Sequence, residues 1–128
     1  MKLDEYQQLA LRTAPEHQTV HDDLMHAAMG VCTEGGELLD LSKKHTFYGK
    51  PVDWHNAAEE IGDVLWYCAL AARALGLPLE QIAKLNIDKL KARYPGKFDA
   101  DKAINRNVEG ERTIIETLSV GTGINHPV

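Results

Sequence analysis

The chain has 128 residues and a mass of 14.2 kDa, and its 14 Lys and Arg against 19 Asp and Glu give a net charge of −5. A chain of this length folds as a single domain, and its acidic balance excludes the basic surface that binds duplex DNA or anionic membranes. Because no apolar stretch reaches transmembrane length and the N-terminus lacks a signal-peptide core, we expect a cytoplasmic protein with no nucleic-acid or membrane partner.

Apolar residues recur every three or four positions along most of the chain, and no stretch alternates with period two, which predicts helices and no strands. Proline and glycine mark the breaks between them. The expected helices, in chain order, cover residues 3–13, 21–45, 54–76, 78–93 and 107–118. Asp53 is the expected N-cap of the third helix. We therefore predict one all-α domain over residues 1–118, an antiparallel bundle of four to five helices, and a flexible tail over 119–128.

Two acidic pairs stand in the two longest expected helices, Glu34 with Glu37 and Glu60 with Asp63. Within each pair the spacing is i, i+3, so both carboxylates leave the same side of their helix. The 22 residues between Glu37 and Glu60 allow the chain to finish one helix, turn and return antiparallel. Four carboxylates would then repel one another in a small volume, and a multivalent cation bound among them would relieve that repulsion.

Three glycines, Gly35, Gly36 and Gly62, lie inside the same two helices, where each costs about 1 kcal/mol relative to alanine. Two interpretations account for them: the glycines allow close packing of the helices, or they leave room around a bound ion and its ligands. The sequence does not choose between the two.

The expected fourth helix carries an amide and two cations, Asn86, Lys89 and Arg93, in the same arc as its apolar residues. Burying an unpaired charge is costly, so a helix that only fills a core would not place cations there. Either these side chains reach outward along their aliphatic stems or pair with acidic residues, or they face an anion such as a phosphate chain.

Together these motifs resemble the MazG-like family of all-α nucleoside triphosphate pyrophosphohydrolases. In that family an ExxE motif is followed, after a spacer, by ExxD, as Glu34-x-x-Glu37 is followed by Glu60-x-x-Asp63. The resemblance covers about residues 3–106. Further segments that carry it are Glu5–Gln7, Lys44–Lys50, Glu59–Tyr67 and Asn86-x-x-Lys89-x-x-x-Arg93.

The resemblance implies hydrolysis of a (deoxy)nucleoside triphosphate to the monophosphate and pyrophosphate. Glu34, Glu37, Glu60 and Asp63 would be both the catalytic residues and the ligands of Mg²⁺, for which Mn²⁺ could substitute. Carboxylate oxygens suit Mg²⁺, and no cysteine or histidine accompanies them to favour zinc. One carboxylate could instead act as general base, and Glu37 is the candidate.

Six further residues are candidates for substrate binding. Lys89 and Arg93 would neutralise phosphate oxygens, and Asn86 would hold a phosphate or sugar oxygen. Lys44 and Lys50 are additional phosphate candidates, although solvated lysines are common. Another candidate, Tyr67, could stack on a base or ribose, or could equally be an aromatic at a helix interface.

Family members form homodimers or homotetramers with composite sites, so the resemblance also implies a homo-oligomer here. Trp66 supports this, because it points away from the apolar stripe of its helix and suggests a contact between subunits. Three alternative functions remain: a phosphoribosyl-ATP pyrophosphatase-like enzyme, a non-catalytic helical module that binds metal and nucleotide, and a di-iron oxidoreductase. The di-iron class needs Glu-x-x-His motifs, which the sequence lacks.

Overall fold

The computed structural model describes residues 1–119, and every regular element among them is a helix, which confirms the predicted all-α class. The elements are α1 (Leu3–Ala10), the 3-10 helix η1 (Leu11–Thr13), α2 (Val20–Tyr48), α3 (Trp54–Ala74), α4 (Leu79–Arg93), α5 (Ala100–Ile104) and α6 (Val108–Ile115). None of these helices is long and apolar enough to cross a membrane. Apart from Ser119, the predicted tail lies outside the described residues.

Local capping explains where the long helices begin and end. Thr19 caps α2 by accepting a hydrogen bond from the backbone N–H of Asp22, and Asp53 caps α3 by accepting two from its first turn, as predicted. The helix α2 ends at Gly49, whose φ of 64° is the left-handed conformation that favours glycine. Short α5 was not predicted. Its five residues begin after the N-cap Asp99 and are too few to show a helical period.

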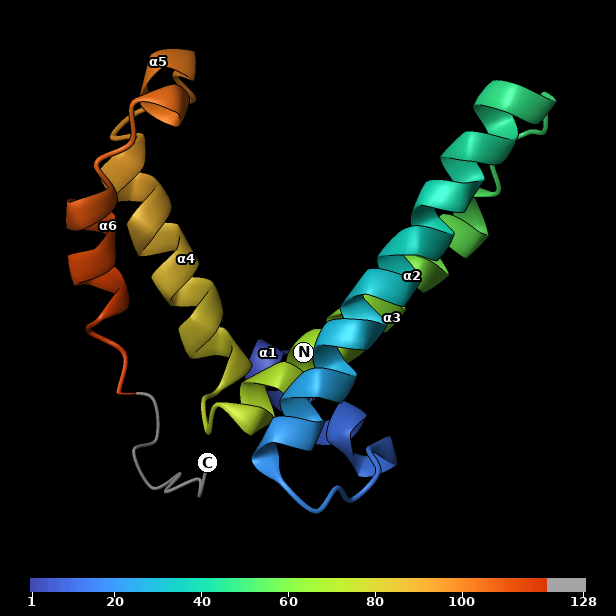
Figure 1. The fold of residues 1–128 in the computed structure, drawn as a ribbon, viewed down its shortest axis with the longest axis horizontal. Coiled ribbons are helices and arrows are strands. Elements are labelled where there is room, and N and C mark those ends of the chain that lie inside the picture. Colours follow the sequence, from blue (N-terminus) through green and yellow to red (C-terminus); the bar gives the residue numbers. More distant parts are fainter. Residues whose placement is uncertain (120–128) are drawn as a thin grey trace.

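The helices form a V rather than the closed bundle of four to five helices that we expected (Figure 1). One arm is the antiparallel pair α2 and α3, and the other is α4 with α5 and α6, while α1 lies at the junction and contacts both α3 and α4. The sequence pattern could not reveal this, because it shows that α4 has an apolar face and not which helix covers that face. In the structure α1 and α6 are its main partners, and α4 diverges from α3.

Small residues allow α2 and α3 to pack closely. Alanines form most of the buried core, and at Gly30 an added Cβ would lie 2.2 Å from the ring of Tyr67. At Gly35, Gly36 and Gly62, by contrast, an added Cβ would meet nothing within 4 Å. The interpretation that these three glycines allow close packing therefore fails within this chain. The glycine that does so is Gly30, which sequence analysis did not single out.

Polar contacts fasten the N-terminal segment to the first arm and also join the two helices of that arm. Trp66 donates its indole N–H to the carbonyl oxygen of Ala10 and to the hydroxyl of Thr13, at 3.1 and 2.9 Å. Arg73 on α3 binds Asp23 on α2 through two hydrogen bonds. The indole N–H of Trp66 thus binds the start of the same chain, and a contact of its half-buried ring with another subunit stays a prediction.

A buried carboxylate joins the helices of the second arm. Glu111 on α6 is only 3% exposed, and it accepts two hydrogen bonds from Arg93 on α4, at 2.7 and 2.6 Å, and a further close contact from Arg106. Hydrogen bonds from Arg93 and then from Arg106 lower the pKa of Glu111 to about 2. Since burying an unpaired charge is costly, the ionised Glu111 depends on both cations.

We predict that this arm loses stability in acid. The pKa of Glu111 is lower in the folded state, about 2, than its ordinary value of 4.5, so its contribution is complete above about pH 4.5 and is lost as the pH falls through about 2. Urea unfolding at pH 6 and pH 3 should show a larger loss for the wild type than for Glu111→Gln. Glu109→Gln, an exposed change on the same helix, should behave as the wild type. Equal pH dependence in all three proteins would contradict the assignment.

Candidate metal centre

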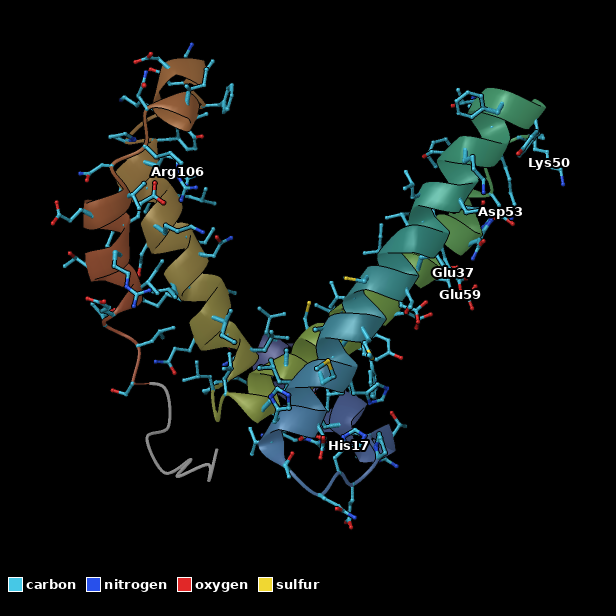
Figure 2. The ribbon with its side chains drawn as sticks, in the orientation of Figure 1. His17, Glu37, Lys50, Asp53, Glu59 and Arg106 are labelled. Atoms are coloured by element: carbon cyan, nitrogen blue, oxygen red, sulfur yellow. The ribbon has the colours of Figure 1, made fainter. Side chains whose placement is uncertain are left out.

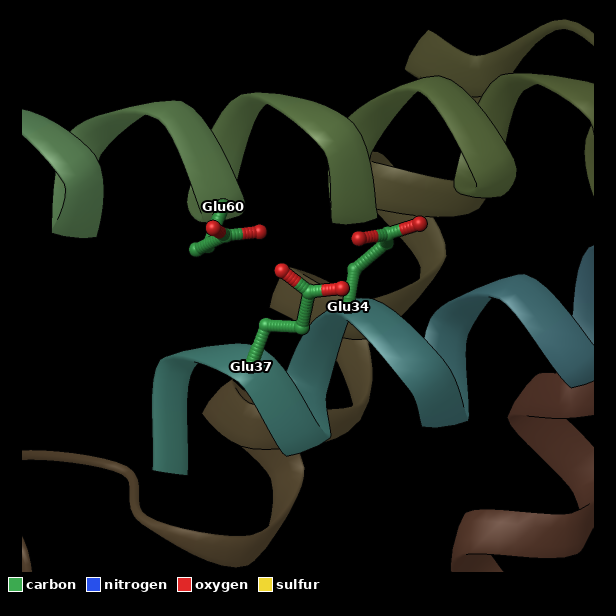
Figure 3. Close-up of side chains that lie close together, drawn as sticks. All are labelled: Glu34, Glu37 and Glu60. Carbon is green, nitrogen blue, oxygen red and sulfur yellow. The ribbon is translucent and has the colours of Figure 1, made fainter. Parts of the chain in front are cut away.

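Three glutamates from the two helices of the first arm meet at one point (Figure 3). Glu34 and Glu37 come from α2 and Glu60 comes from α3, and each offers one carboxylate oxygen within 4.8 Å of the other two. The i, i+3 spacing places the first two on one side of α2, and the antiparallel packing of α3 against α2 places Glu60 opposite them. The predicted meeting of the two acidic pairs therefore occurs for three of the four carboxylates.

The glutamates differ in burial. Glu60 is 5% exposed, and the side-chain amide of Asn56 donates a hydrogen bond to its Oε1 at 2.6 Å. Glu34 is half-buried and Glu37 is exposed. Burial is the main cause that raises the pKa of Glu34, and the negative charges of Glu37, Asp63 and Glu60 raise it further. The part of this rise in pKa that comes from the neighbouring charges agrees with the repulsion that the sequence predicted.

Asp63, the fourth predicted carboxylate, lies outside the group of three. It is exposed on α3, one turn beyond Glu60, and its negative charge reaches Glu34. It also acts on Tyr6 of α1, where burial first and the charge of Asp63 second raise the pKa of the phenol. Asp63 thus acts on the cluster through its charge. It is not one of the three carboxylates whose oxygens lie within 4.8 Å of one another.

The donor set of the cluster suits a hard divalent cation. All three groups are carboxylates, with neither histidine nor cysteine among them, and oxygen donors favour Mg²⁺ or Mn²⁺ over zinc. The cluster also borders a cavity of about 360 Å³. Its lining residues are Thr33, Gly36, Glu37, Asp40, Leu41, Lys44, Asn56 and Glu60.

A family model described as the MazG nucleotide pyrophosphohydrolase domain matches residues 22–109, more than half of the chain. The chain belongs to this MazG family. The matched segment contains both acidic pairs and all of α4, which confirms the resemblance drawn from those motifs. Comparisons with curated proteins and with solved structures gave no match.

Of the predicted lysine contacts in this MazG domain, Lys44 lies at the cavity and Lys50 does not line it. Lys44 pairs with Asp40, whose pKa falls to about 2 because Lys43 and Lys44 both donate to it. Lys50 is exposed in the loop that joins α2 to α3, at the tip of the arm (Figure 2), and its carbonyl oxygen contacts the ring of His45.

The predicted contacts on α4 lie on the other arm of the MazG domain (Figure 1). Asn86 and Lys89 line a separate, largely apolar cavity of about 600 Å³ whose lining contains none of the three glutamates. Arg93 binds Glu111 through Nε and Nη2, which matches the alternative interpretation that a cation on this helix pairs with an acidic residue. Its role toward phosphate stays a prediction.

Tyr67 also has an observed structural partner. Its ring lies against Gly30, and its centroid is 5.5 Å from that of His26 and 4.9 Å from that of Trp66. These contacts match the interpretation of Tyr67 as an aromatic at a helix interface, within this chain. Stacking of Tyr67 on a base stays a prediction.

Sequence analysis missed three polar residues of the cavity, Thr33, Asp40 and Asn56. Asn56 precedes Glu60 by four residues, so helical spacing alone places their side chains together. Asp40 likewise stands three residues after Glu37 and four before Lys44. Asn56 and Asp40 could therefore both have been found from the sequence, at positions one helical turn before or after an acidic motif.

We predict that Mg²⁺ stabilises this protein by binding the folded cluster, adding about 2.7 kcal/mol when the ion concentration is about 100 times its Kd. Thermal unfolding with and without Mg²⁺ measures the shift. Glu60→Gln should lose most of it, because one of three carboxylates is removed. Glu59→Gln removes the same charge from an exposed neighbour on α3 and should keep the shift. An unaltered shift in Glu60→Gln would exclude Glu60 as a ligand.

Proposed function

We propose that this MazG domain hydrolyses a (deoxy)nucleoside triphosphate to the nucleoside monophosphate and pyrophosphate, with Mg²⁺ bound by Glu34, Glu37, Glu60 and Asp63. The observation that carries the proposal is the meeting of three carboxylates from the ExxE and ExxD motifs within 4.8 Å, in a chain that belongs to a nucleotide pyrophosphohydrolase family. A bound divalent ion would supply neutralisation of phosphate charge and a water of lowered pKa.

The residues of the chain have separable tasks in this proposal. Glu60, which Asn56 contacts, and the half-buried Glu34 would hold the ion. Glu37 is the exposed member of the cluster and borders the cavity, so it is the candidate to accept the proton of the attacking water if one carboxylate acts as general base instead of as a ligand. The water oxygen forms a bond to the α-phosphorus, the bond from that phosphorus to the bridging oxygen breaks, and pyrophosphate leaves. Lys44, at the same cavity, would bind a phosphate oxygen.

The proposal includes a homo-oligomer, because one chain leaves much apolar surface uncovered. Met29 and Leu39 on α2 and Ile61 on α3 are 60%, 69% and 58% exposed. A helix that is apolar beyond one face is usually buried in an assembly. A second copy packed on this arm would cover these residues. It could also bring Asn86 and Lys89 of its own α4 to the acidic cluster.

The reaction is tested by incubating the purified protein with a panel of (deoxy)nucleoside triphosphates, with and without Mg²⁺. We expect Mg²⁺-dependent monophosphate and pyrophosphate, and no orthophosphate. A phosphoribosyl-ATP arm of the panel detects the related pyrophosphatase activity. Nucleotide binding without turnover across the whole panel would instead assign the chain as a non-catalytic module.

The shared site is tested by subunit complementation. Glu60→Gln and Lys89→Met chains, each inactive alone, are co-expressed with different tags and purified as a mixed oligomer. In a two-fold symmetric dimer one of its two sites then contains neither substitution, so activity should return to about half of the wild-type value. A mixed oligomer that stays inactive would place both residues in the site of a single chain.

A further inference from the structure

Asn56 binds directly to the buried member of the acidic cluster. Its side-chain amide lies 2.6 Å from Oε1 of Glu60, and both residues line the same cavity of about 360 Å³. The amide nitrogen must be the atom that faces Glu60, because the amide oxygen in its place would set two acceptors against each other. Hydrogen bonds to a carboxylate are among the stronger ones in proteins.

The position of Asn56 is itself fixed by the start of α3. The carboxylate of Asp53, the N-cap, accepts a hydrogen bond from the backbone N–H of Asn56 at 3.1 Å. The Asn56 side chain then reaches one turn along the helix to Glu60. Asp53 therefore holds the backbone of Asn56, and the side chain of Asn56 in turn holds the carboxylate of Glu60.

We propose that Asn56 is a positioning residue for the metal centre: it holds one oxygen of Glu60 and directs the other toward the ion bound with Glu34 and Glu37. This inference rests on the proposed function of the cluster as a metal site. Asn56 donates to Oε1, and Oε2, the other oxygen of the same carboxylate, would be available to an ion. Partners of this kind commonly change metal affinity or activity by about 10- to 100-fold when they are removed.

Near the cluster, the other polar groups have different partners. Lys44 pairs with Asp40, and the hydroxyl of Thr33 donates to the carbonyl oxygen of Gly30. Among these polar groups of the described chain, Asn56 is thus the one that donates a hydrogen bond to a carboxylate of the cluster. Its removal should leave Glu60 in place on α3 but free to rotate, which affects ion binding more than folding.

The test measures Mn²⁺ binding by electron paramagnetic resonance, without nucleotide, for the wild type, Asn56→Leu and Asn56→Ala. The leucine change keeps much of the volume and removes the donor, and the alanine change is the second variant in case the first fails to fold. Both should bind Mn²⁺ at least about 10-fold more weakly. Thermal unfolding in EDTA should show that both remain folded.

Asn105→Leu is the matched control, because Asn105 donates the same kind of bond to Asp101 over four residues, at 2.8 Å, away from the cluster. It should keep the wild-type affinity for Mn²⁺. Unchanged affinity in both Asn56 variants, with wild-type turnover present, overturns the inference alone. Weaker Mn²⁺ binding in those variants, with no turnover by the wild type, supports the inference and overturns the proposed reaction. A wild type that binds no Mn²⁺ overturns both.

Discussion

Repulsion between carboxylates on two adjacent helices is the constraint on which the site of this protein depends. Packing of α2 against α3 holds Glu34, Glu37 and Glu60 with oxygens within 4.8 Å of one another. Each like-charged neighbour opposes that arrangement, and these charges, after burial, contribute to the raised pKa of Glu34. The close contact of Gly30 with the Tyr67 ring is part of the packing that sustains it. In the proposed function, a divalent cation bound among these carboxylates would relieve that repulsion.

The two arms of the V manage charge in opposite ways. On the first arm, three glutamates meet with carboxylate oxygens within 4.8 Å of one another, an arrangement consistent with binding a divalent ion. On the second arm, the buried Glu111 forms ion pairs with Arg93 and Arg106 and is neutralised within the chain. Removing one partner of a buried ion pair is costly, because the other charge stays buried and unpaired. The Glu111 cluster thus stabilises the second arm, and the proposed metal centre lies on the first.

The size of the core explains why a single chain leaves its site open. Leu70 is the one large side chain that is fully buried among the described residues, and the rest of the core is mostly alanine. Long helices with such a narrow core cannot cover both of their faces. An assembly would bury the remaining apolar surface, and it would supply the cations of α4 to an acidic arm that has few of its own. In the proposal, oligomerisation and catalysis are therefore linked, because one chain alone neither covers its apolar surface nor brings the cations of α4 to the acidic cluster.

Local sequence was sufficient to predict the main helices and the family. Helical periods, the cap at Asp53 and the spacing of the acidic pairs depend on residues within about four positions of each other. Each of these features is therefore encoded in a short stretch of chain and needs no contact with a distant residue. The extended motifs also indicated the MazG family, which the match over residues 22–109 established.

Which side chains meet was settled by the packing of whole helices. Packing placed Glu60, and not Asp63, beside Glu34 and Glu37. It also paired Arg93 with Glu111 and placed Trp66 against Ala10. The helices form a V and not the predicted bundle for the same reason. Each of these outcomes depends on how one helix rotates and tilts against another. That choice is made by contacts between residues far apart in the chain, and no local pattern contains it.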